Sequence, residues 1–225
     1  MGARLIMNKP QAYGTFVKRG SNTFRTSAYL QWGDSDKSIG SALLLNPGSA
    51  NFHKINPVLK ITLDSQGESS GEIKPDPTME QLVLFLEGIH KEGLPLAGRF
   101  HIYNLFNLQN AKSDDAVEQL ESLAGTGVYN ITESVASVEE LQKHPWILLG
   151  WGMKQNTQWR NLEQTKRLWM DRISESGIFS FGKKHHRYND YYHPCPLIPT
   201  NRPVMLADLL SIYHRELGNS VNGTL

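Results

Sequence analysis

The stretch SALLLNPGSA (residues 41–50) combines an apolar run with an abrupt Asn-Pro-Gly ending. Three further short apolar runs follow along the chain: FHIYNLF (100–106), WILLGWG (146–152) and GIFSFG (177–182). None of the four alternates cleanly between apolar and polar residues, which indicates strands that are buried on both faces. The sequence therefore predicts four central strands.

Helical patterns separate these strands. Apolar residues recur at helical spacing in residues 77–93, 113–125, 156–177 and 203–218. Strands that alternate with helices are typical of α/β proteins, in which helices cover both faces of a parallel sheet. We therefore expect an α/β fold: a single domain with a central, mostly parallel four-stranded sheet flanked by helices on both faces.

Two segments fall outside this alternation. The segment AYLQWGDSDKSIGSALLL (28–45) predicts an N-terminal hairpin that leads into the first central strand. Residues 53–75 are polar and rich in turn residues, and we expect them to form a flexible excursion from the sheet. No break in composition divides the 225 residues, so the sequence predicts one domain over residues 1–225, with its core at about 26–218.

Composition limits the partners and the compartment of the protein. The formal net charge is +1, so a nucleic-acid-binding surface has to be local. Cys195 is the single cysteine, which excludes an intrachain disulfide and disfavours a zinc site built on thiolates. The sequence has no apolar stretch of about 18 residues and no signal-peptide pattern. We therefore expect a cytoplasmic monomer with no membrane partner, no metal and no cofactor.

In open parallel sheets, ligands bind beyond the carboxyl ends of the strands. The residues at the ends of the four apolar runs are therefore the first candidates for a functional site. They include Asn46, Pro47 and Gly48 after the first run, Asn104 in the second, and the segment KKHHRYNDYYHPCPL (183–197) after the last. Taken alone, Asn-Pro-Gly is also an ordinary strand-ending turn, because all three residue types favour turns.

The order of four motifs, LLLNPG, IYNLFN, ILLGWG and HPCPL, resembles the uracil-DNA glycosylase superfamily over residues 41–197. The first motif is similar to the branch of that superfamily that carries Asn-Pro-Gly. The chain also resembles DUF1643, a bacterial family of unassigned function that shares the Asn-Pro, Asn-Leu-Phe and Trp-Gly elements. The superfamily resemblance implies a DNA glycosylase, which turns a nucleotide out of the duplex and hydrolyses its N-glycosidic bond.

The resemblance assigns roles to individual residues. Asn46 would position the hydrolytic water, and His193 would stabilise the negative charge that develops on the leaving base. Asn104 would recognise the Watson–Crick edge of the flipped base, in one amide orientation for uracil or thymine and in the other for cytosine. Leu197 would enter the duplex in place of the extruded nucleotide.

Further residues complete the expected site. Gly48 stands where another branch carries a tyrosine that excludes thymine, so a substituent at C5 of the base would fit. Asp76 is either a substitute catalytic carboxylate or the cap of the next helix. Phe52 is either a stacking partner for the flipped base or a core residue. Expected contacts to the DNA backbone are Ser49, Lys183, Lys184, Arg187, Pro194 and Cys195.

The sequence thus predicts a monofunctional DNA glycosylase whose partner is double-stranded DNA and whose substrate is a flipped pyrimidine altered at C5. Glucosylated hydroxymethylcytosine of some viral genomes is one such base, and its excision would serve antiviral defence. Three alternatives stay open: a uracil or mismatched-thymine repair glycosylase, a catalytically inactive DNA- or nucleotide-binding module, and a hydrolase of free nucleosides or modified nucleotides. The inactive module stays open because Asn46 supplies no carboxylate.

Overall fold

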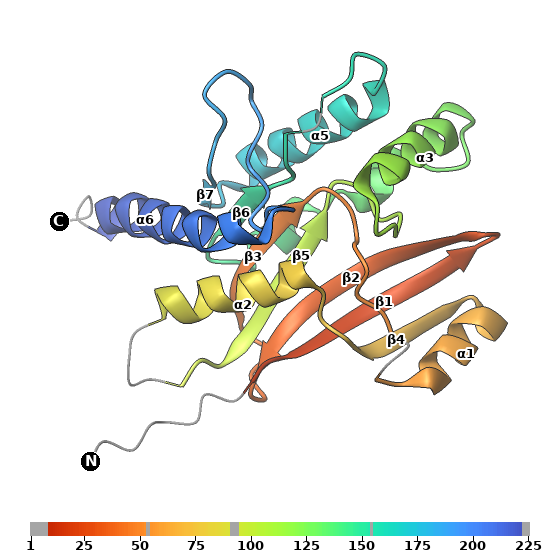
Figure 1. The fold of residues 1–225 in the computed structure, drawn as a ribbon, viewed down its shortest axis with the longest axis horizontal. Coiled ribbons are helices and arrows are strands. Elements are labelled where there is room, and N and C mark those ends of the chain that lie inside the picture. The colour runs from red at the N-terminus through yellow and green to blue at the C-terminus, as the bar shows by residue number, and fades with distance from the viewer. Residues whose placement is uncertain (1–8, 53–54, 91–94, 154, 222–225) are drawn as a thin grey trace.

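The computed structural model describes residues 9–52, 55–90, 95–153 and 155–221 (Figure 1). These residues form one α/β domain around a sheet of seven strands, in the order β4-β1-β2-β5-β3-β6-β7. The strands are β1 (Gln11–Arg19), β2 (Asn22–Trp32), β3 (Ser38–Leu44), β4 (Glu68–Ile73), β5 (Gly98–Asn104), β6 (Ile147–Gly150) and β7 (Ser180–Phe181). The α-helices are α1 (Pro57–Gln66), α2 (Pro77–Ile89), α3 (Ser113–Gly125), α4 (Val138–Leu141), α5 (Arg160–Ser176) and α6 (Arg202–Val221), and the 3₁₀ helices are η1 (Ile131–Ser134) and η2 (Pro199–Asn201).

Half of the sheet is parallel and is made by the four apolar runs of the sequence. Strand β3 lies between β5 and β6 and is parallel to both, and β7 is parallel to β6. Side chains of β3 and the residue after it alternate between two hydrophobic cores: Ala42 and Leu44 belong to one, and Leu43 and Leu45 to the other. A strand that is buried on both faces needs apolar residues at every position, which explains the unbroken run.

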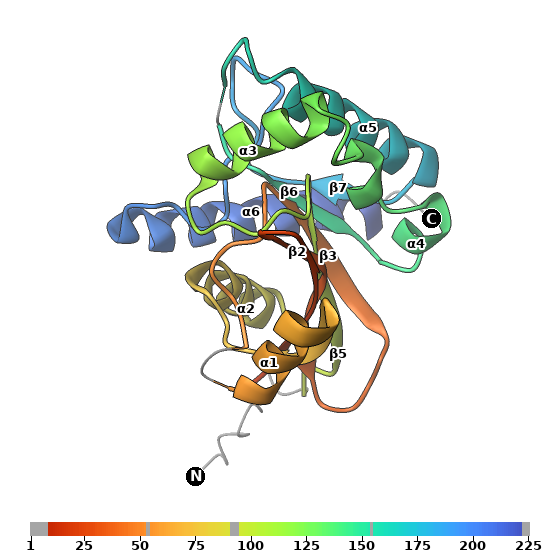
Figure 2. The same cartoon turned by 90° about the vertical axis from the view of Figure 1, so that its right-hand side faces the viewer.

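Helices cover both faces of the sheet, as expected. One core contains buried side chains of α1, α2 and α6, and the other contains buried side chains of α3, α4 and α5. Figure 2 shows α1 and α2 on one side of the strands and α3 and α5 on the other. The carboxyl ends of the parallel strands are covered by loops and by the first turns of helices, among them α2.

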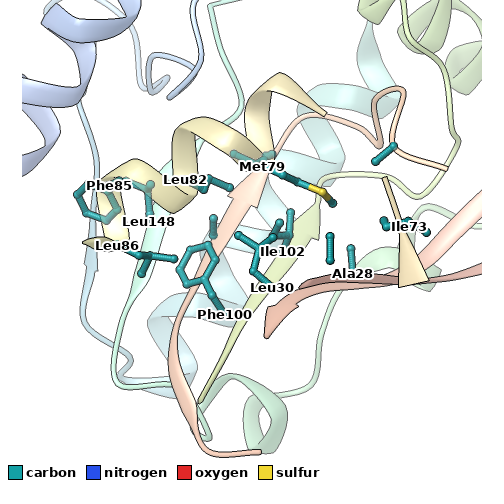
Figure 3. Packing of buried hydrophobic residues seen from close by; sticks show 14 of the residues in the cluster. Ala28, Leu30, Ile73, Met79, Leu82, Phe85, Leu86, Phe100, Ile102 and Leu148 are labelled. Carbon is teal, nitrogen blue, oxygen red and sulfur yellow. The ribbon is translucent and has the colours of Figure 1, made fainter. Parts of the chain in front are cut away.

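Helix α2 shows how local sequence and packing combine. Asp76 caps the helix by accepting a hydrogen bond from the Met79 backbone N–H at 3.0 Å, and Pro77 occupies the first turn, where its missing N–H costs nothing. Apolar residues at helical spacing, among them Leu82 and Phe85, pack onto the sheet (Figure 3). Burial of each such side chain stabilises the fold by about 1.5–3 kcal/mol, so Phe85→Ala should be severely destabilising.

The other half of the sheet corrects the prediction of a mostly parallel, four-stranded sheet. Strands β4, β1 and β2 extend the sheet beyond β5, and all their pairings are antiparallel. The hairpin is formed by β1 and β2 and not by residues 28–45, because β5 separates β2 from β3. Ala12 and Phe16 of β1 are core residues, so the core extends beyond its expected start at residue 26.

Residues 53–75 also differ from the expected flexible excursion. Residues 53 and 54 lie outside the described part, but the rest of the segment contains helix α1 and strand β4. Asn56 caps α1, and β4 pairs with β1 at the edge of the sheet. The polar composition reflects an edge location, where one side of each element faces solvent, and not a lack of structure.

Candidate functional site

A cavity of about 560 Å³ opens at the carboxyl ends of the parallel strands. Its wall is built from the loop after β3, the start of α2, the loop after β6, and the segment before α6. Seven of the expected site residues line it: Asn46, Gly48, Ser49, Asp76, His193, Cys195 and Leu197. The structure therefore brings these seven residues together near the carboxyl ends of the parallel strands.

Asn46 is held in one orientation. Its side-chain nitrogen Nδ2 donates to the carbonyl oxygens of Pro47, at 2.9 Å, and of Asn110, at 2.8 Å. Both amide hydrogens are therefore used, and Oδ1 is the group of this side chain that remains to contact a ligand. An acceptor at this position can orient a water molecule, but it cannot remove a proton from it.

Asp76 supplies a carboxylate next to Asn46. One oxygen, Oδ1, caps helix α2, while Oδ2 lies so close to Gly48 that a β-carbon at position 48 would come within 2.9 Å of it. The two alternatives for Asp76 are therefore not exclusive, because the helix cap also lines the cavity. Gly48 has no side chain, and the carboxylate of Asp76 lies against the space that a side chain at position 48 would fill.

His193 lines the same cavity. Burial lowers its pKa below the ordinary value of 6.5, although its backbone contact with Cys195 and the charge of Asp76 act in the opposite direction. The ring is therefore neutral at pH 7. Its Nδ1 atom lies 3.2 Å from the Cys195 backbone nitrogen and 3.0 Å from the Cys195 oxygen. In the tautomer that accepts the Cys195 N–H, Nε2 carries the proton and acts as a donor.

Beyond His193 the chain leaves the cavity through an exposed apolar segment. Leu197 is 92% exposed, and Ile198 beside it is 60% exposed. The backbone is nevertheless fixed, because Arg202 Nε donates to the Pro196 oxygen at 3.2 Å. Leu197 and Ile198 thus form a small apolar patch that is held out into solvent at the rim of the cavity.

Cys195 and Pro194 are buried under this segment. Burial raises the pKa of the Cys195 thiol, which keeps it protonated and unreactive at neutral pH. Pro194 packs so closely on β6 that a β-carbon on Gly150 would lie 2.7 Å from its ring. Pro194 is not among the residues that line the cavity. Its contact with β6 fixes the position of the loop that carries His193.

The expected aromatic and amide contacts to a base lie elsewhere. Phe52 is 2% exposed and packs edge-on against Phe16, with ring centroids 4.8 Å apart. It belongs to the core and does not line the cavity. Asn104 also lies behind the cavity wall, where it lines a second cavity of about 160 Å³ and accepts a hydrogen bond from Arg25.

The three basic residues of the loop after β7 lie outside the cavity. Lys183 forms an ion pair with Asp208 of α6 at 2.6 Å, so its ammonium group is already partnered. Lys184 and Arg187 are exposed. Their side chains can contact phosphates only on DNA that extends past the cavity.

A buried polar network fixes the base of this loop. Asp190 accepts a hydrogen bond from Trp151 Nε1 at 2.7 Å and from Gln155 at 3.1 Å, and it forms an ion pair with Lys166 of α5 at 2.8 Å. Burial acts to raise the pKa of Asp190, but these hydrogen bonds outweigh burial and lower it. Because Trp151 also lines the cavity, the network connects the cavity wall to α5.

Arg25 is the site residue that the sequence analysis did not identify. It lies on β2 and lines both cavities, although it is only 4% exposed. The pairing of β1 with β2 shifts by one residue between Thr15 and Phe16, so Phe16 lies opposite Arg25 and not opposite Thr26. This β-bulge places Arg25 on the same face of the sheet as Phe16, which strict alternation along β2 would not predict.

No cluster of three histidine, cysteine or acidic residues that could hold a metal ion is found in the described residues. No helix in the described part of the chain has the length and the apolar composition that crossing a membrane requires. Comparison of the chain with protein-family models, with curated proteins and with solved structures finds no match. The geometry of the cavity is therefore the basis for a functional proposal.

Proposed function

We propose that the protein is a monofunctional DNA glycosylase that acts on a flipped pyrimidine nucleotide with a substituent at C5. The observation that carries the proposal is the convergence of Asn46, Asp76 and His193 on one cavity. An orienting acceptor, a carboxylate and a neutral imidazole can each stabilise one part of the transition state for hydrolysis of an N-glycosidic bond. The resemblance of the four motifs to the uracil-DNA glycosylase superfamily supports the same reaction.

In the proposed reaction, water attacks C1′ of the sugar while the bond between C1′ and the base breaks. The electron pair of that bond leaves with the base, and the sugar carries positive charge in the transition state. Asn46 Oδ1 orients the water. Asp76 stabilises the positive charge and takes the proton of the water, which replaces the carboxylate that position 46 lacks. His193 Nε2 donates to the base oxygen on which negative charge develops.

The cavity is suited to a substituted base. Its volume of about 560 Å³ lies in the range of sites that hold whole small-molecule ligands, which is more than a bare pyrimidine fills. Other side chains that line the cavity, among them Ser49, can hydrogen-bond to a hydroxyl group on the substituent. Hydroxymethylated and glucosylated pyrimidines carry such hydroxyls. Excision of bases of this kind from viral DNA in the cytoplasm would leave abasic sites and act as antiviral defence.

Leu197 supports duplex DNA as the substrate. A flipped nucleotide leaves a gap in the base stack, and apolar side chains that enter such gaps are a recurrent device of DNA-binding proteins. Leu197 is exposed at the rim of the cavity, in the position from which it can fill the gap. Lys184 and Arg187 would then contact phosphates of the flanking duplex.

The test is a cleavage assay on a panel of duplexes. Each duplex contains one uracil, G·T mismatch, 5-methylcytosine, 5-hydroxymethylcytosine or glucosylated hydroxymethylcytosine, and hot alkali converts abasic sites into strand breaks. We expect breaks with a C5-substituted base, lost in Asn46→Ala and in His193→Ala. His186→Ala is the matched control, because His186 is exposed outside the cavity. Intact DNA throughout the panel, with binding retained, would leave only a DNA-binding module.

A further inference from the structure

Arg25 has hydrogen-bonding capacity that the described part of the protein leaves unused. Its Nη2 atom donates to Asn104 Oδ1 at 3.3 Å, whereas Nε and Nη1 have no partner among the described residues. The side-chain nitrogen of Asn104 is likewise buried without a partner there. Two neighbouring side chains thus hold buried, unused N–H groups at the wall between the two cavities.

Such an arrangement is costly for the fold alone. A buried charge destabilises a protein unless it is paired and hydrogen-bonded. Asp76 offsets part of the cost through its charge, but it forms no hydrogen bond with Arg25. Buried polar groups in native proteins are nearly always satisfied, and each exception calls for an explanation, such as a catalytic role or a bound water, ion or ligand. Arg25 therefore has the properties of a ligand-binding group.

The chemistry of these groups restricts the ligand. A guanidinium group donates hydrogen bonds and accepts none. Asn104 could accept through Oδ1, but that atom is engaged by Arg25, so its remaining group is also a donor. The pair therefore complements adjacent acceptors. Cytosine presents two adjacent acceptors, N3 and O2, whereas uracil and thymine present an N3–H donor between two carbonyl oxygens. That N–H would face the N–H groups of Arg25.

We propose that Arg25, held in place by Asn104, is the residue that selects the base, and that it selects cytosine-type over uracil-type pyrimidines. The inference rests on the proposed glycosylase function and adds the class of base to it. It also assigns Asn104 a different role from the one expected. Asn104 positions Arg25, and Arg25, which lines the cavity, makes the contact with the base edge.

The experiment compares two bases that share one C5 substituent. Duplexes carry 5-hydroxymethylcytosine or 5-hydroxymethyluracil on a 2′-fluorinated sugar, which slows cleavage so that Kd is measured by fluorescence anisotropy. We expect the wild-type protein to bind the cytosine duplex about tenfold or more tightly, since one good pair of contacts to a base edge discriminates by about that factor. Arg25→Met should bring the ratio close to one.

Two further variants keep the inference falsifiable if Arg25→Met folds poorly. Arg25→Lys retains the charge but not the planar set of donors, so its ratio should also fall. Arg99→Met is the matched control, because Arg99 donates to Gln31 and lies outside the cavity, and it should keep the wild-type ratio. Equal wild-type affinities, or a ratio unchanged in both Arg25 variants, would overturn the role of Arg25 alone. A wild-type protein that neither binds nor cleaves any duplex would overturn the proposed function itself.

Discussion

Replacement of Asp76 by asparagine and by alanine separates its two roles. Asparagine is as good a helix cap as aspartate, so Asp76→Asn keeps the hydrogen bond from Met79 and loses only the charge. Asp76→Ala loses both. The two variants lack the same charge, so the difference between their stabilities is the cap, about 1 kcal/mol. For a chain of this size that corresponds to about 2–4 °C in Tm.

Activity should follow the charge and not the cap. If the carboxylate takes the proton of the water, both variants should cleave about 100-fold or more slowly than the wild type, measured as single-turnover rates on the preferred duplex. Asn56→Ala is the control, since it removes the cap of α1 away from the cavity and should lower Tm without lowering the rate. Wild-type cleavage by Asp76→Asn would refute the catalytic role of the carboxylate.

Three further predictions concern the cavity rim and the buried network. Leu197→Ala should leave Tm unchanged, because the side chain is 92% exposed. The same variant should bind duplex DNA more weakly, with a smaller loss for single strands. Equal losses of affinity for both would contradict insertion of Leu197 into the duplex. Lys166→Met should lower the free energy of unfolding by about 3–5 kcal/mol, because it leaves Asp190 buried without its ion-pair partner. Urea titrations measure this change. A loss below about 1 kcal/mol would show that the ion pair is dispensable for stability. Because the pKa of Asp190 is lowered in the folded protein, its carboxylate should stabilise the fold fully above the ordinary pKa of 3.8. That contribution should be lost as the pH falls below this value. In Asp190→Asn, the free energy of unfolding should therefore decrease less steeply with falling pH.

Sequence alone predicts the parallel half of the sheet, because there a continuous apolar run marks a strand that is buried on both faces. The runs that form β3 and β6 are apolar because both of their faces are covered. Strand β1 alternates between buried and more exposed residues over most of its length, and β2 does so from Ala28 onward. Strand β2 pairs with β5, some 70 residues further along the chain. A local pattern does not reveal such a partner. The Gly20-Ser21 turn, with Gly20 at φ 60°, was the signal for their hairpin.

The same distinction applies to the site. Asn46 follows β3 closely, where a general rule locates ligands, whereas His193 is identified by the resemblance of its HPCPL motif. Arg25 lies in the antiparallel half, to which that rule does not apply, and a one-residue bulge decides which way it points. Phe52 follows the Asn-Pro-Gly turn closely, but the chain turns it inward onto Phe16. The directions in which the side chains of Arg25 and Phe52 point depend on tertiary packing and not on the neighbouring residues in the sequence.

The cavity is assembled from segments that are far apart in the chain, and this has a consequence for synthesis on the ribosome. Arg25 is bonded to a residue 79 positions later, and Asn46 to one 64 positions later. His193 and Leu197 arrive only with the last fifth of the 225 residues. A nascent chain therefore holds no complete cavity until residue 197 has been synthesised. A product that ends before residue 193 would lack the imidazole and the apolar rim, and under the proposed function it could not excise a base.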